Sequence, residues 1–227
     1  TRQATGIGLA TATDFGRDLA ASGVPVISGL ARGIDAAAHR GALAATWSAG
    51  DSAAPTIAVL PVGIDAIYPP SHRGLASAIL EKGGTLLSEY PPGTLPATWR
   101  FPERNRVIAG MARGALVVEA PLKSGALITA SHALDAGRDV FIAEAILGGP
   151  MNAGADALAA EGASCLASAG ELLAEWGLDS GNSTPDQAAR QSRGFRVDEG
   201  DEAFLAASLR AELGIAAAPS LKGEGKP

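Results

Sequence analysis

Short apolar runs alternate with longer alanine-rich stretches of helical period along the first 176 residues. The apolar runs predict strands at 24–28, 56–60, 85–89, 115–119, 139–143 and 163–166. The stretches between them predict helices at 10–22, 35–45, 71–82, 102–112, 126–136, 153–160 and 169–176. Because the apolar runs are nearly continuous, each strand should be covered on both faces, as in a parallel sheet. The pattern therefore predicts an α/β fold with a doubly wound, mainly parallel sheet.

The two ends of the sequence depart from this pattern. The first helix has no apolar run ahead of it, so we expect the first strand of the sheet to be missing, as though it lay just before Thr1. After Trp176 the composition changes, and residues 179–185 have linker chemistry. We therefore expect a domain at 1–176, followed by a linker and a mostly disordered tail at 177–227.

Composition excludes several classes of protein. No apolar run approaches the ~18 residues of a transmembrane helix, and the start lacks the pattern of a signal peptide. The one cysteine, Cys165, cannot form an internal disulfide, and no Cys/His cluster is spaced to hold zinc. We expect a cytoplasmic protein with no metal and no cofactor.

The net charge of −6 is unevenly distributed. Residues 1–150 hold 12 Lys/Arg and 12 Asp/Glu, whereas residues 151–227 hold 6 Lys/Arg and 12 Asp/Glu. Between Arg100 and Arg113, four arginines accompany a single acid, Glu103. A neutral domain can carry a cationic face, so the overall charge does not exclude a nucleic-acid ligand.

Three segments near strand ends carry candidate chemistry, because ligands of parallel α/β sheets bind beyond the carboxyl ends of the strands. The first segment is Ser28-Gly-Leu-Ala-Arg-Gly-Ile-Asp35. Gly29 and Gly33 let the backbone approach a ligand, and Arg32 can grip a phosphate with two donors. We expect Asp35 to cap the helix that follows.

This first segment also has a structural interpretation. It could be a tight strand-to-helix turn with a solvated arginine. His39, which lies on the same helix face as Asp35, is better explained as a packed side chain than as a ligand.

The second segment is Phe101-Pro-Glu-Arg-Asn-Arg-Val-Ile-Ala-Gly110. Proline is favoured at the first position of a helix, so we expect the helix to begin at Pro102. Arg104 and Arg106 then fall in its first turn, where cations oppose the helix dipole. Two such cations indicate a compensating anion, either a bound phosphate or a carboxylate.

The two arginines differ in their surroundings. Arg104 shares a helix face with apolar residues, so we expect it to be half-buried and paired within the protein. Arg106 points elsewhere and is the better ligand candidate. If the compensating anion is a carboxylate, Glu103 or Glu119 would supply it.

Two aromatic residues, Trp99 and Phe101, precede this helix. Aromatic rings interleaved with arginines can stack unpaired bases. The same rings could equally belong to the core, and the sequence leaves that choice open.

The third segment, Glu119 to Ala130, again joins a strand to a helix. Ser124 and Gly125 offer a cap and an amide nest for an anion, and Lys123 adds a positive charge. The alternative is a plain helix N-terminus with a surface lysine. The spacing of an NTPase phosphate loop is absent.

Taken in order, these motifs resemble the DNA-processing protein A family, also called DprA or Smf. The motifs that carry the resemblance are Ser28–Asp35 with His39, Tyr68–Pro70, Ser88–Gly93, Phe101–Gly110, Val117–Ala120 and Ser124–Ala130. The resemblance implies a Rossmann-like domain that is not an enzyme. It implies a homodimer that binds single-stranded DNA without strong sequence preference and loads the RecA recombinase in natural transformation.

The resemblance also implies which residues contact DNA. Matched position by position, the DNA-binding set is Gly29, Arg32, Gly33, Arg104, Asn105, Arg106, Lys123, Ser124 and Gly125.

One enzymatic alternative remains, a nucleotide N-glycosidase built on a related Rossmann-like sheet. That class carries a catalytic glutamate in a glycine-rich segment that corresponds to Lys123–Ser131. No carboxylate stands in that segment here, and Glu119 lies before it. No Ser-His-Asp set or carboxylate pair stands out elsewhere.

Overall fold

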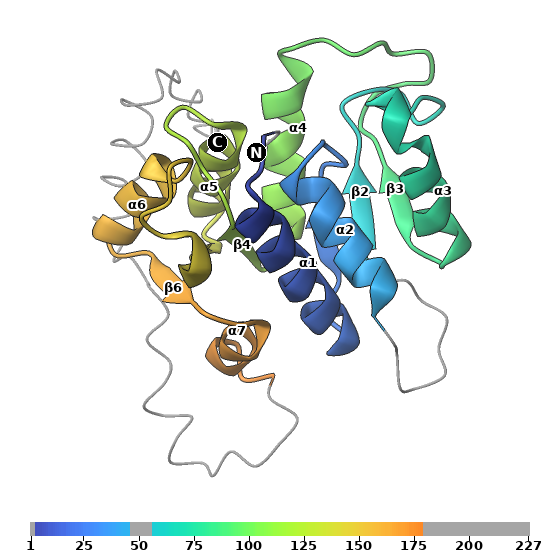
Figure 1. The fold of residues 1–227 in the computed structure, drawn as a ribbon. Helices are drawn as coiled ribbons and strands as arrows, with labels where there is room; N and C mark the ends of the chain where they lie inside the picture. The colour runs from blue at the N-terminus through green and yellow to red at the C-terminus, as the bar shows by residue number, and fades with distance from the viewer. Residues whose placement is uncertain (1–2, 46–55, 179–227) are drawn as a thin grey trace, which may run out of the picture.

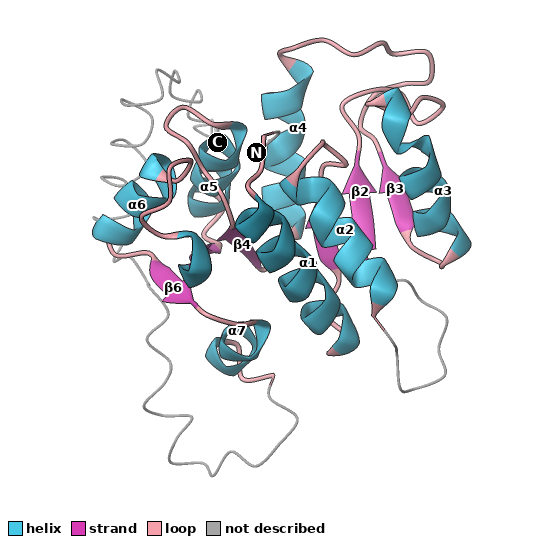
Figure 2. Cartoon of the chain, viewed as in Figure 1, coloured by secondary structure: helices cyan, strands magenta, loops and turns pink. Residues whose placement is uncertain are grey.

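The computed structural model describes residues 3–45 and 56–178, which form alternating strands and helices (Figures 1 and 2). The strands are β1 (Val26–Ser28), β2 (Thr56–Val59), β3 (Thr85–Leu87), β4 (Gly114–Val117), β5 (Asp139–Ala143) and β6 (Ser164–Leu166). The α-helices are α1 (Gly6–Ala21), α2 (Ile34–Ala44), α3 (Arg73–Glu81), α4 (Arg100–Met111), α5 (Gly125–Asp135), α6 (Ala153–Ala160) and α7 (Ala169–Glu175). Two 3-10 turns complete the set, η1 (Pro70–His72) and η2 (Glu144–Ile146).

Every strand pairing in the described part of the chain is parallel, as the sequence predicts. The strands form two sheets, with the orders β1-β2-β3 and β4-β5-β6. In the first sheet each later strand lies farther from β1, and in the second each later strand lies farther from β4. The direction in which strands are added therefore reverses between β3 and β4, as in a doubly wound fold. The expectation of an α/β, mainly parallel fold is confirmed.

The two sheets do not join into one. Among the described strands, β1 pairs with β2 alone and β4 pairs with β5 alone, so the facing edges of β1 and β4 are unpaired. In a doubly wound sheet, the strand that precedes the first helix lies between these two edges. The structure has a cavity there instead, and no strand precedes α1 in the residues from 3 onward.

Each sheet has its own hydrophobic core. The larger core surrounds β4, β5 and β6 and includes the fully buried Ile142 and Leu158. The smaller surrounds β1, β2 and β3 and includes Leu60 and Ile79. Helix α1 connects the halves, because its Phe15 belongs to the larger core while the helix packs along α2.

Helix boundaries differ from the sequence expectation at two N-termini. Helix α1 begins at Gly6 rather than at residue 10, because the hydroxyl of Thr5 accepts a hydrogen bond from Gly8 N and caps it. Helix α4 begins at Arg100, so Pro102 is its third residue. Proline is tolerated there because the first-turn amides have no partner within the helix.

The expected tail and the expected lack of a membrane-spanning helix can both be compared with the described residues. The expected tail falls almost entirely outside them, since they end at residue 178. None of the helices that the structure describes combines the length and apolar character needed to cross a bilayer.

Candidate nucleic-acid interface

Three successive residues of α4 reach three different loops at the carboxyl edge of the sheets. Arg104 bonds to the loop after β1, Asn105 to the loop after β4, and Arg106 to the segment after β3. The strands are parallel within each sheet, and α4 connects the end of β3 to the start of β4. Residues 104–106 of α4 therefore connect the segments that follow β1, β3 and β4.

Arg104 is a buried structural residue with only 4% of its surface exposed. Its Nη1 donates to the carbonyl oxygen of Gly29 at 2.7 Å and also to the carbonyl oxygen of Val59. Its Nε donates to Asn105 Oδ1 at 3.1 Å. The expected pairing of Arg104 within the protein is confirmed, but its partners are carbonyl groups rather than Glu103 or Glu119.

Asp35 does not cap α2, contrary to the expectation. The helix begins at Ile34 with Gly33 as its N-cap, and Asp35 lies in the first turn. Its Oδ2 instead accepts hydrogen bonds from Gly29 N at 3.0 Å and Ala31 N at 3.3 Å. This carboxylate therefore occupies the amides of Gly29 and Ala31, so these two groups are not open to an external anion.

The charge of Asp35 depends on Arg104. Burial is the largest single effect on the Asp35 carboxyl and would raise its pKa, but the positive charge of Arg104 and weaker effects in the same direction together lower the pKa. His39 and the Ala31 amide act in the same direction. The loop after β1 is thus stabilised by the Asp35 carboxylate, which accepts from its amides, and by the Arg104 guanidinium, which donates to the Gly29 carbonyl.

The loop after β1 presents Arg32 to solvent. Gly33 has a φ of +83°, which glycine adopts without strain, and Leu30 has a φ of +57°. Gly29 is buried. A side chain at this position would overlap the Arg104 guanidinium, so only glycine fits there. Arg32 is exposed at the tip of this loop.

His39 is a packed side chain, as the sequence analysis expected. It is fully buried. Thr56 Oγ1 donates to the Val26 carbonyl at 2.9 Å and therefore accepts from His39 Nδ1, 2.6 Å away. Nε2 has no hydrogen-bond partner in the described part of the chain. Burial lowers the pKa of His39 to about 4, with Arg104 acting in the same direction.

The loop after β4 presents Lys123 and an uncapped helix end. Lys123 is exposed and has a φ of +59°, a left-handed conformation that is strained for a lysine. Ser124 is the N-cap of α5 by its backbone, yet its side chain makes no capping bond and its Oγ is buried without a partner among the described residues. The space beside Gly125 is open, so an anion can approach the first amides of the helix.

Asn105 ties this loop to α4. Its Nδ2 donates to the Gly125 carbonyl oxygen at 3.2 Å, and Thr129 Oγ1 donates to the same oxygen at 3.1 Å. The side chain of Asn105 therefore links Arg104 on one side to the start of α5 on the other.

Arg106 is exposed and forms an ion pair that the sequence did not identify. Its Nη2 lies 2.6 Å from Glu89 Oε2, and both side chains are about half exposed. Glu103, the expected partner, instead accepts a hydrogen bond from the Tyr90 hydroxyl at 2.6 Å. Because α4 starts two residues before Pro102, Arg106 is its seventh residue and lies beyond the first turn, where opposition to the helix dipole is strongest.

Glu119 has a structural task. It is 1% exposed and lies against the N-terminus of α1. The backbone amide of Thr5 donates to both of its carboxylate oxygens at 3.1 Å, and the Thr5 hydroxyl also bonds to it. A side chain at Gly8 would overlap this carboxylate. Glu119 therefore supplies the negative charge that a helix N-terminus favours.

The two aromatic residues at the start of α4, Trp99 at its N-cap and Phe101 in its first turn, have different surroundings. Phe101 is half-buried, lines the cavity between the sheets and meets the Tyr68 ring edge-on at 5.5 Å. Trp99 is 56% exposed and is not part of either core.

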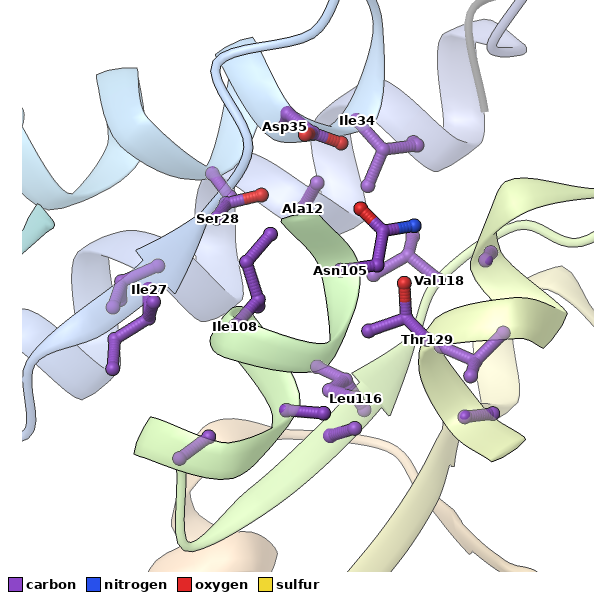
Figure 3. Close-up of a pocket in the computed structure, with 18 of the residues that line it drawn as sticks. Ala12, Ile27, Ser28, Ile34, Asp35, Asn105, Ile108, Leu116, Val118 and Thr129 are labelled. Carbon is purple, nitrogen blue, oxygen red and sulfur yellow. The ribbon is translucent and has the colours of Figure 1, made fainter. Parts of the chain in front are cut away.

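The cavity between the sheets measures about 960 Å³ and is mostly apolar (Figure 3). Ile27 and Ser28 of β1 border it on one side and Leu116 of β4 on the other, and Ile108 of α4 and Ala12 of α1 also line the gap. All three residues of β1 remain half-exposed, in contrast to the largely buried β2. This cavity lies beneath the interface loops. Within residues 3–45 and 56–178, no group of His, Cys, Asp and Glu could hold a metal ion.

The chain is similar to several known proteins. The chain is 39% identical over 207 residues to protein Smf of Escherichia coli, a match that covers 90% of this chain and 52% of that protein. It is 43% identical over 152 residues to DNA processing protein DprA of Streptococcus pneumoniae, covering 66% of this chain and 51% of the other. The chain thus spans about half the length of these curated relatives.

Solved structures show the same fold. An X-ray structure of DNA processing protein A from S. pneumoniae superposes with a TM-score of 0.66 at 37% identity, over 77% of this chain and 59% of that one. The corresponding Helicobacter pylori protein, described in a study of its single-stranded DNA binding mode, gives 0.63 at 25% identity, over 76% and 75%. The family model of DNA recombination-mediator protein A matches residues 1–177, and the chain belongs to that family.

Proposed function

We propose that this chain binds single-stranded DNA along the carboxyl edge of its two sheets. The observation that carries the proposal is the linkage of three loops by Arg104, Asn105 and Arg106. This linkage sets the exposed cations Arg32 and Lys123 in a common framework with Arg106, and an extended strand of phosphates needs several grips of this kind.

The residues divide into two roles. Arg32, Lys123 and Arg106 contact phosphates, and the first amides of α5 at Ser124 and Gly125 receive another. The ion pair of Arg106 with Glu89 is solvent-exposed, so it is worth no more than about 1 kcal/mol and a phosphate can replace it.

Arg104 and Asn105 are positioning residues, because their polar groups are engaged with the loops. Gly29 and Gly33 shape the loop that carries Arg32. This division refines the sequence-based set, in which all nine residues were candidates for DNA contact.

The names of family members support single-stranded DNA as the ligand and a role in DNA processing. The H. pylori member is described by its single-stranded DNA binding, and other members are named DNA processing proteins. We propose that this chain likewise acts in natural transformation as a cytoplasmic homodimer that passes single-stranded DNA to the RecA recombinase. Phosphate contacts with few base-reading groups suit a protein that must accept any sequence.

An N-glycosidase is not favoured by the contacts of Glu119. A catalytic glutamate must reach substrate, whereas this carboxylate is buried against Thr5 at the start of α1. The corresponding loop at 123–125 carries a cation, which suits phosphate binding rather than acid catalysis.

Titration of fluorescent oligonucleotides at several salt concentrations tests the proposal. Each phosphate that a lysine or arginine neutralises on a single strand contributes about 0.7 to the slope of log K against log salt, so the three cationic contacts should give a slope of about −2. Arg32→Ala and Lys123→Ala should each weaken binding by roughly fivefold, about 1 kcal/mol, and each should reduce the slope by about 0.7.

Arg40→Ala provides a matched control. Arg40 is an exposed arginine on the body of α2, outside the loops that follow the strands. Its loss should leave affinity and slope unchanged. Equal losses for Arg32→Ala and Arg40→Ala would mean that net charge, not this interface, controls binding, and the proposal would be wrong.

A further inference from the structure

We propose that Trp99 is a stacking site for an unpaired nucleobase, at one end of the DNA-binding edge. This inference rests on the proposed function and extends it from phosphates to a base. Trp99 belongs to a group of three side chains, Tyr90, Arg100 and Trp99, which we call the Arg100 stack. The ligand is the planar face of any base in a single strand.

The Arg100 stack holds the indole in a fixed position. The guanidinium carbon of Arg100 lies 4.6 Å from the centre of the Trp99 ring and 5.3 Å from the centre of the Tyr90 ring. Arg100 also donates to the Leu95 carbonyl, and the Tyr90 hydroxyl donates to Glu103 at 2.6 Å. Burial and Glu103 raise the pKa of Tyr90 to about 12, so this hydroxyl keeps its proton and its bond at physiological pH.

Trp99 nevertheless stays open to solvent. It is 56% exposed, although one face of its ring is covered by Arg100. A large apolar ring that is both ordered and exposed gains free energy when a ligand covers it. Because its position is already fixed, little side-chain entropy is lost when a ring stacks on it.

The position of the stack matches the path proposed for DNA. Trp99 is the N-cap of α4, at the end of the connection that rises from β3 over the sheet edge (Figure 1). Tyr90 is adjacent to Glu89, the partner of Arg106. A strand whose phosphate meets Arg106 therefore has its neighbouring nucleotide close to this group.

The charged surroundings favour a base over a protein partner. Arg100, Glu103 and Arg106 lie within the same stretch of α4 as Trp99. A protein docking site needs a wider apolar surface depleted of charge. A nucleotide suits this setting because its base stacks on the indole while its phosphate faces the arginines, as in other single-strand binders.

The test compares two oligonucleotides of equal length and phosphate number, one of thymidines and one with abasic sites. Trp99→Ala should weaken binding of the thymidine strand about tenfold and leave binding of the abasic strand unchanged. Trp99→Phe should retain most of the affinity, because the ring is kept. The salt slope should not change in either variant, because no charge is removed.

A second Arg–Trp pair in the same chain supplies the control. Arg113 lies 4.9 Å from the centre of the Trp176 ring, beside the start of β4 at the opposite edge of the sheet. Arg113→Ala removes the cation of a similar stack away from the proposed path and should change binding of neither oligonucleotide.

The outcomes separate this inference from the proposed function. If wild-type protein binds neither oligonucleotide, the proposed function fails. If it binds the thymidine strand and Trp99→Ala does not weaken that binding, or weakens binding of both strands equally, the DNA-binding edge stands and the stacking site is wrong.

Discussion

At the scale of single residues, the interface contains side chains that are bonded within the protein and side chains that are exposed to solvent. Arg104 and Asn105 have their polar groups engaged in the protein, whereas Arg32 and Lys123 extend into solvent from loops whose backbone is already fixed. Two non-glycine residues, Leu30 and Lys123, adopt positive φ in these loops. Such conformations persist where surrounding structure enforces them, and they often occur at functional sites.

Lys123 permits a test that separates its backbone role from its charge. Lys123→Gly and Lys123→Ala should weaken single-stranded DNA binding equally, by roughly fivefold, because both remove the cation. The glycine variant should be more stable than the alanine variant by up to about 1 kcal/mol, because only glycine adopts a φ of +59° without strain. Urea denaturation measures the stability difference, and oligonucleotide titration measures binding. A glycine variant less stable than the alanine variant would contradict this account.

At the scale of elements, α1 and α2 form the most extensive contact between two helices in the described part of the chain. Gly16 of α1 faces the backbone of Ala38, and Gly41 of α2 faces the backbone of Thr13. The absence of side chains at these two glycines lets the helices approach closely. Since α1 also contributes Phe15 to the larger core, this contact connects the two halves of the molecule.

Gly41→Ala should therefore destabilise the protein by about 1–3 kcal/mol. The added methyl group would overlap the Thr13 carbonyl oxygen and lie 3.0 Å from the amide nitrogen of Arg17, and neither backbone group can move without shifting α1.

Gly110→Ala is the matched control for that substitution. Gly110 is an exposed glycine within α4 that has open space around its Cα, so alanine there should stabilise the protein by about 0.5–1 kcal/mol. Thermal denaturation of both variants gives the comparison, and shifts of the same sign would refute the packing argument.

At the scale of the whole molecule, two three-stranded sheets flank an apolar cavity, and a largely buried polar cluster lies beside the β1-β2-β3 sheet. The cluster comprises Asp35 and His39 of α2, His72 of η1 and Arg104 of α4, with Thr56 of β2 as the hydrogen-bond partner of His39. Burial opposes charge on His39, and the charges of Arg104 and His72 oppose it further. Asp35 favours that charge but does not compensate.

This cluster predicts that stability falls in mild acid. In the unfolded chain His39 binds a proton near pH 6.5, whereas in the folded protein its pKa is about 4. The unfolded state therefore binds more protons between these values, so the free energy of unfolding rises with pH across this window and is lost as pH falls from 6.5 to 4. The full effect is about 3 kcal/mol.

Urea denaturation at pH 7 and at pH 4.5 measures that loss. In His39→Asn the side-chain amide can still donate to Thr56 but does not titrate, so its stability should fall less over the same range. Identical pH dependence in the two proteins would mean that His39 is not the responsible group.

Local patterns along the chain determined the elements and much of the interface. Near-continuous apolar runs identified the six strands and their parallel character, because a strand covered on both faces needs apolar residues at successive positions. The glycines and cations of 28–35 and 119–130 identified two of the loops, since turn chemistry depends on nearest neighbours.

Tertiary structure alone decided which groups meet. Arg104 bonds to a carbonyl 75 residues away, and Glu119 bonds to Thr5 across 114 residues. Arg106 pairs with Glu89 rather than Glu103, which the Tyr90 hydroxyl holds. These pairings depend on which loops the fold brings to the same edge of the sheets. The pattern of neighbouring residues along the chain does not determine which loops meet. The separation of the strands into two sheets around a cavity is decided at the same level, because it depends on which strand edges find a neighbour.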